Sequence, residues 1–276
     1  MRRILLVLVF WIGTGLNLQA GPQVSEDMDG LARALGLPEI IAVMREEGLQ
    51  NGAELASDMF PGRGGDNWNA MVSKIYDPDW MTDIVWTGLA DELDSADITA
   101  LTTFFTSAIG HKIVGLEVSA RQALLDDAVE AASKDRLAEL TADGDPLLDL
   151  VGEYVEVNDL LEYNVVGAMN SNYAFYTGLQ DGGAFDESLT EEQILTDVWS
   201  QEDVIRADTE EWLYSFLAMA YRPLSEEELK EYIALSETAE GQALNRALFA
   251  AFDKLFVAVS HALGRSAATF VVGEDL

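Results

Sequence analysis

A pattern that occurs twice, at residues 93–110 and 224–241, constrains the fold of this chain more than any other feature. In each copy, apolar residues recur at spacings of three and four, which places their side chains on one face of an α-helix. A Ser or Thr follows, and a Gly stands three residues after it. The matching pairs are Leu93 with Leu224, Ile98 with Leu229, Leu101 with Tyr232, Phe104 with Leu235, Ser107 with Thr238, Ala108 with Ala239 and Gly110 with Gly241. This recurrence predicts an internal repeat of one helical unit.

Within each copy, the residue types predict a helix, a sharp corner and a second helix. Ser225 and Glu228 have the spacing of a capping box, which would begin the first helix of the second copy. Ser107 and Thr238 are expected to cap the helix after each corner. The glycine that follows each cap lacks a Cβ atom, so we expect it to let this helix pack closely against the preceding one. A phosphate site at this glycine is not favoured, since a glycine-rich loop and a preceding strand are both missing.

The remaining segments also favour helices. Apolar residues continue at helical spacing for about five turns after each corner, and Thr190 with Gln193 forms another capping box. Residues 37–41 align weakly with 157–161, and only residues 270–272 resemble a strand. We therefore predict an all-α fold of about ten to a dozen helices. These would form two tandemly duplicated bundles, residues 21–145 and 146–276, after a signal peptide at residues 1–20.

The first twenty residues have the features of a secretory signal peptide. Arg2 and Arg3 precede an apolar run at residues 4–12, and Ala20 is a small residue at the predicted cleavage site. The alternative is an N-terminal membrane anchor, but the apolar run is short for a helix that crosses a bilayer, and we expect no other stretch to be long enough. The predicted mature chain therefore begins after Ala20, lies in the periplasm or is secreted, and has no stable membrane span.

The charge balance and the absence of cysteine argue against several classes of partner and site. The chain has 49 acidic and 16 basic residues, a formal net charge of −33, which argues against binding nucleic acid or anionic lipid. It has no Cys, which excludes disulfides, thiolate nucleophiles and cysteine-based metal centres. Residues 137–205 contain no Lys or Arg and sixteen Asp or Glu. This acidic stretch is interpreted as a solvated surface, or alternatively as a region that attracts a basic protein or divalent cations.

Residues 104–112, with the sequence Phe-Phe-Thr-Ser-Ala-Ile-Gly-His-Lys, resemble a motif of a known family. The family is called domain of unknown function 2059, and its pattern is roughly F-Y-x-S-P-x-G-x-K. Ala108 replaces the proline here, and the second copy keeps the cap and the glycine but lacks the aromatic pair and the lysine. The resemblance implies an all-helical, mostly exported bacterial protein, and it implies no reaction.

No residue is singled out as catalytic, cofactor-binding or metal-binding. His111 and His261 stand alone, without the paired histidines of zinc sites. Residues 77–79 and 143–145, and the polar set of 170–172 with Asp181, do not follow a calcium-loop pattern, and 143–145 is interpreted as the turn between the two copies. Four tryptophans at helical positions are expected in the core: Trp80, Trp86, Trp199 and Trp212.

These features favour a non-enzymatic exported protein of the bacterial envelope. We expect it to bind a protein, a peptide or a small apolar ligand, with no cofactor. One alternative is a hydrolase with a carboxylate-based site between the two copies, which would require two or three converging acids with raised pKa values. The other alternative is an acidic binder of divalent cations.

Overall fold

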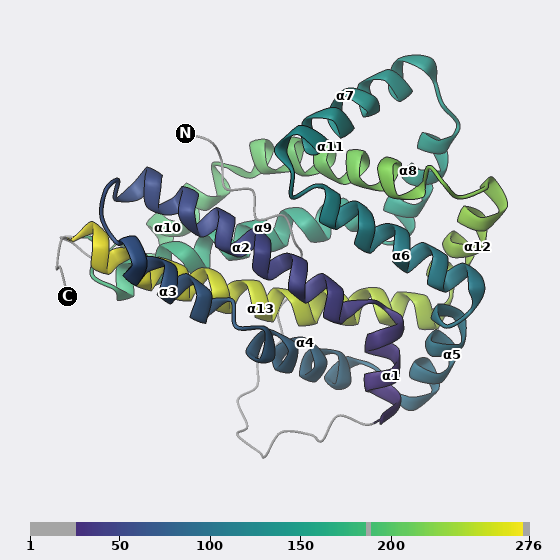
Figure 1. The fold of residues 1–276 in the computed structure, drawn as a ribbon, viewed down its shortest axis with the longest axis horizontal. Coiled ribbons are helices and arrows are strands. Elements are labelled where there is room, and N and C mark those ends of the chain that lie inside the picture. Colours follow the sequence, from purple (N-terminus) through teal and green to yellow (C-terminus); the bar gives the residue numbers. More distant parts are fainter. Residues whose placement is uncertain (1–25, 186–188, 273–276) are drawn as a thin grey trace.

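The computed structural model describes residues 26–185 and 189–272, which form thirteen α-helices and no strand (Figure 1). The all-α prediction is therefore confirmed. Residues 270–272 are not a strand, because Phe270 and Val271 end the last helix. The helices are α1 (Glu26–Ala34), α2 (Leu37–Met59), α3 (Gly65–Ile75), α4 (Pro78–Glu92), α5 (Ser95–Phe105), α6 (Ala108–Ala123), α7 (Asp127–Asp143), α8 (Leu147–Val157), α9 (Leu160–Asp181), α10 (Glu191–Trp199), α11 (Glu202–Tyr221), α12 (Glu226–Glu237) and α13 (Ala239–Val271). The predicted signal peptide lies outside the described residues.

The order of helix pairs recurs along the chain. In the first half, α1 packs on α2 and α5, and α2 packs on α3; in the second half, α8 packs on α9 and α12, and α9 packs on α10. In the sequence, helix α7 lies between these two sets of helices. Helices α2 and α9 begin at Leu37 and Leu160, so their starts correspond. The sequence alignment instead pairs residue 37 with residue 157, three positions earlier. The tandem duplication itself stays a prediction.

The two halves exchange helices and do not form separate bundles. Helix α4 of the first half packs along α13 of the second, and α11 of the second half packs along α6 of the first. One cluster of buried apolar side chains consequently runs through both halves, from Met28 to Ala268. The predicted boundary after Asp145 falls in the turn between α7 and α8, where Gly144 ends α7 with a left-handed backbone.

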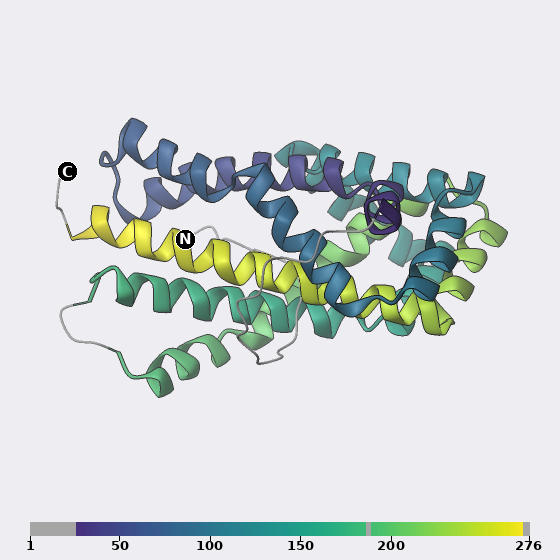
Figure 2. The ribbon, with the colours of Figure 1, turned by 90° about the horizontal axis from the view of Figure 1, so that it is seen from below.

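Helix α13 is the central element of the fold, in contact with α9, α4 and several other helices (Figure 2). Among the described residues it is the one helix long and apolar enough to cross a membrane. The expectation that no stretch beyond the signal peptide reaches this length and composition is therefore wrong. Within the protein, however, 61% of its most apolar window is buried. An apolar composition of this kind is also what a core helix requires when neighbours surround it.

Candidate functional site

The two predicted corners have the same geometry. At the first corner, Ser107 Oγ accepts a hydrogen bond from the Gly110 amide at 3.1 Å, and at the second, Thr238 Oγ1 accepts from the Gly241 amide at 3.0 Å. A Cβ atom on Gly110 would lie 2.2 Å from the Phe104 carbonyl oxygen, and one on Gly241 would lie 2.0 Å from that of Leu235. The prediction that these glycines permit close helix packing is confirmed, and the motif has a structural role.

The lysine of the motif joins the two halves. Lys112 on α6 forms an ion pair of 2.6 Å with Glu228 on α12. Glu228 also accepts a hydrogen bond from the Ser225 amide, which completes the capping box that begins α12. The hydrogen bond from Lys112 lowers the pKa of the Glu228 carboxyl below its usual value. The lysine therefore stabilises the start of a helix in the other half.

A buried polar cluster lies between α6 and the second half. Its members are Glu117 on α6, Tyr154 on α8, Tyr221 at the end of α11 and Tyr232 on α12. Tyr221 Oη donates a hydrogen bond to Glu117 Oε1 at 2.7 Å, and Tyr232 also bonds to this carboxyl. The Tyr154 and Tyr232 rings stack with centroids 5.0 Å apart. Residue Glu117 as a whole is partly exposed, but its carboxyl group is enclosed.

Burial raises the pKa of Glu117 to about 7, and the two tyrosine hydrogen bonds lower it only in part. This is the feature that the hydrolase alternative would need, but it is present in a single carboxyl. No second acid contributes to the raised pKa of Glu117. Two carboxyl groups are the minimum for the paired acid and base of glycoside hydrolysis. The cluster is better understood as a hydrogen-bonded contact that holds α6 against α8, α11 and α12.

A second enclosed acid lies within the second half. Asp253 on α13 is 8% exposed, and its Oδ1 accepts a hydrogen bond from Asn170 Nδ2 on α9 at 3.2 Å. Burial raises the pKa of Asp253 to about 7. Asp181, which the sequence grouped with 170–172, instead pairs with His261 at 2.9 Å. The polar residues of this set therefore serve separate contacts and do not converge on one ion.

The remaining sequence candidates are also dispersed. His111 is exposed at the start of α6. Asp145 accepts a hydrogen bond from the Leu147 amide at 3.0 Å and pairs with Arg222, so it begins α8 as a turn residue. Within 26–185 and 189–272, no group of three His, Asp or Glu side chains is arranged to hold a metal ion.

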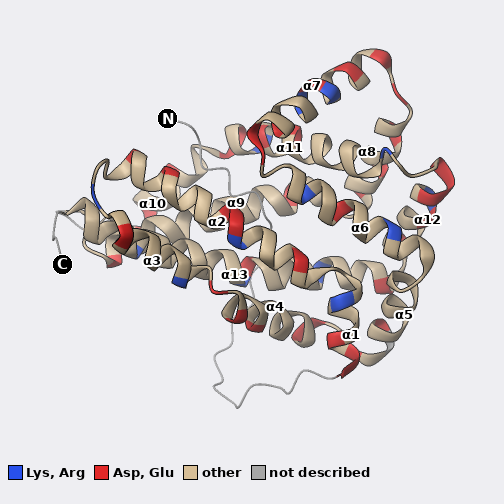
Figure 3. Cartoon of the chain, in the orientation of Figure 1, with Lys and Arg blue, Asp and Glu red and all other residues tan. Residues whose placement is uncertain are grey.

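The acidic stretch does not form one face. Its residues are distributed over α7 to α11, and acids also occur on α1, α4 and α12 (Figure 3). Two arginines that follow the acidic stretch in the sequence form ion pairs with some of its acids. Arg206 pairs with Glu162 and Glu202, and Arg222 pairs with Asp145. The acids of α10 differ, since no ion pair to them occurs in the part of the chain that the structure describes.

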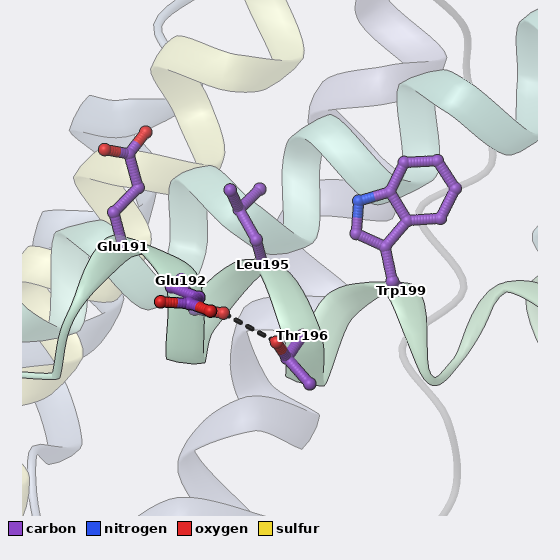
Figure 4. Close-up of a pocket in the computed structure, with 5 residues that line it drawn as sticks. All are labelled: Glu191, Glu192, Leu195, Thr196 and Trp199. Carbon is purple, nitrogen blue, oxygen red and sulfur yellow. Dashed lines mark hydrogen bonds between the residues drawn. The ribbon is translucent and has the colours of Figure 1, made fainter.

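Helix α10 lies on the outside of the molecule beside α9 (Figure 2). Ile194 and Val198 on its inner side are buried in a small apolar cluster with Val165 of α9 and Ile205 of α11. On the opposite side, an open pocket is lined by Glu191, Glu192, Leu195, Thr196 and Trp199 (Figure 4). We call these five residues the α10 surface.

The apolar side chains of the α10 surface are uncovered. Leu195 is 38% exposed, and Trp199 is 60% exposed, the largest fraction of any large apolar side chain among the described residues. The expectation of a core tryptophan is right for Trp86, at 7%, and wrong for Trp199 and for Trp80, at 38%. Residues 191, 195 and 199 are one turn apart, so their side chains line one stripe of the helix. The sequence signal that could have indicated this surface is a nine-residue helix with two apolar pairs, Ile194 with Val198 and Leu195 with Trp199, that point in different directions.

The similarity of this chain to a known family is confined to one segment. A family model described as "Uncharacterized protein conserved in bacteria (DUF2059)" matches residues 79–139. This segment runs from the first turn of α4 into the second half of α7 and contains the first corner, Lys112 and Glu117. It falls within the first of the two predicted copies, residues 21–145, and does not include α10. No curated protein and no solved structure matches the chain.

Proposed function

We propose that this chain is a non-enzymatic binding protein of the bacterial envelope, and that it binds another protein or a peptide through the α10 surface. The observation that carries the proposal is the exposure of Trp199 and Leu195 together on one stripe of one helix. Exposed apolar residues scattered singly need no explanation, whereas an exposed tryptophan grouped with other apolar atoms is typical of an interface. The expected signal peptide supports a location outside the cytoplasm.

The shape of the surface favours a macromolecular partner. Sites for small apolar ligands are usually enclosed and bury most of the ligand. The pocket on α10 is open, and its walls come from one helix (Figure 4). A partner that lies along the helix could cover more of Leu195 and Trp199 than a small molecule could in a pocket that encloses little of its surface.

Site-specific crosslinking in the envelope tests this proposal. A photoreactive amino acid in place of Leu195 should give an adduct that is lost when Trp199 is changed to Ala. The matched control carries the photoreactive residue in place of Leu49 on α2, which is also 38% exposed, and should not give this adduct. Equal adducts at both positions, or an adduct unaffected by Trp199→Ala, would show that α10 is not the binding surface.

A further inference from the structure

Building on the proposed function, we infer that the partner segment bound by the α10 surface is a basic amphipathic helix. The charge of the surface is the first reason. Glu191 and Glu192 are the first two residues of α10, and both are exposed. Their nearest base along the chain, Arg206, is already engaged by Glu162 and Glu202. The α10 surface therefore presents negative charge that the described chain does not neutralise, beside apolar area that it does not cover.

The geometry of the surface is the second reason. The stripe from Glu191 to Trp199 covers eight helical steps, a length of about 12 Å. Leu195 and Trp199 are one turn apart, which matches apolar side chains at positions i and i+4 of a partner helix packed alongside. Lys or Arg residues beside that apolar stripe would reach Glu191 and Glu192. Recognition of a helix by its apolar face with flanking charges is a common mode of peptide binding.

Other occupants fit less well. A second copy of the chain would bring two acidic surfaces together, and the whole chain has a net charge of −33. Anionic lipid would be repelled by the same residues. Like charges placed opposite each other at an interface are unfavourable, so complementarity requires a positive partner.

Titration of the purified protein with a synthetic peptide tests the inference. The probe is a fluorescent helix-forming peptide of about 14 residues, about four turns, with Leu at i and i+4 positions flanked by Lys. We expect saturable binding that weakens as salt is raised, because salt screens exposed charges. A peptide with Glu in place of Lys, and one with Ser in place of Leu, should not bind.

Two pairs of matched variants locate the binding. Trp199→Ala should weaken binding of the Lys peptide at least about tenfold, as is usual for a central interface tryptophan. Trp80→Ala on α4 should leave the affinity for this peptide within about twofold of the unchanged protein. The double change Glu191→Lys and Glu192→Lys should also weaken binding about tenfold. The double change Asp79→Lys and Asp83→Lys alters the net charge equally at two exposed positions of α4 and should have little effect on binding. Circular dichroism establishes that each variant remains helical.

Four outcomes would overturn the inference. These are equal binding of the Lys and Glu peptides, equal loss in the α10 and α4 variants, dimerisation that requires Trp199 in sedimentation runs, and Trp199-dependent binding to neutral lipid vesicles. The Leu195 crosslink separates this inference from the proposed function. A Trp199-dependent crosslink to a partner protein without binding of the Lys peptide would overturn only the basic-helix assignment. Absence of both would overturn the two together.

Discussion

Helices α3 and α10 hold the same position in the order of the two halves, and each contains a tryptophan, but the two tryptophans have opposite surroundings. Trp68 on α3 is 1% exposed, its indole Nε1 donates to the Gly52 carbonyl oxygen at 2.7 Å, and its ring meets Phe60 and Phe270. Trp199 on α10 is 60% exposed. Helix α3 packs against both α2 and α13, whereas α10 packs mainly against α9. One tryptophan therefore stabilises the fold, and the other is available to a partner.

Replacing each tryptophan with Ala should show the difference between their surroundings as a difference in stability. Trp68→Ala should lower the free energy of unfolding by about 3–5 kcal/mol, because it leaves a cavity in a packed aromatic cluster. Trp199→Ala should change it by no more than about 0.5 kcal/mol, as is usual for an exposed side chain. Urea unfolding of the two variants measures both values. A similar loss in both would show that Trp199 is part of the core.

The enclosed acids between the helices should make the stability of the protein depend on pH. The pKa of Glu117 is raised from 4.5 to about 7, and that of Asp253 from 3.8 to about 7. Below about pH 7 the folded protein keeps protons that the unfolded chain releases near pH 4. The free energy of unfolding should therefore fall as pH rises from about 4 to 7, and level off above pH 7. The loss due to Glu117 alone is of order 3 kcal/mol.

The variant Glu117→Gln isolates one of these two acids. It should reduce the decline in unfolding free energy between pH 5 and pH 8, whatever its stability at a single pH, because Gln does not titrate. Urea midpoints across this range make the measurement, with Glu191→Gln as an exposed control that should keep the original slope. A slope unchanged by Glu117→Gln would contradict an enclosed carboxyl at this position.

Two glycines of α6 differ in the same way, because one is packed against the preceding helix and the other faces open space. Gly110→Ala should destabilise the protein by about 1–3 kcal/mol, since the added Cβ would overlap the preceding helix. Gly115 has open space around an added Cβ, so Gly115→Ala should stabilise the helix by about 0.5–1 kcal/mol. Thermal unfolding compares the two. Stabilisation by both changes would show that the corner is looser than described.

Features set by local spacing were predictable from the sequence. The caps at Ser107 and Thr238, the two corner glycines and the turn at Gly144 depend on residues within four positions of one another. The Glu117 cluster was not predictable, because its three tyrosines come from α8, α11 and α12, which are distant from α6 in the sequence and meet it only in the tertiary fold. The open side of α10 was missed for another reason. Periodicity shows that Leu195 and Trp199 share a stripe, but whether a neighbour covers this stripe depends on tertiary packing.

Trp199, and not Trp68 or Trp80, should contact the basic helical partner. Fluorine NMR of the protein labelled with fluorotryptophan reports each tryptophan separately during titration with the Lys peptide. Resonances are assigned by changing each tryptophan to Phe in turn. We predict that the Trp199 resonance shifts with saturation while those of Trp68 and Trp80 stay in place. A Trp199 resonance that does not move while the peptide binds, or an equal shift at Trp80, would contradict the account.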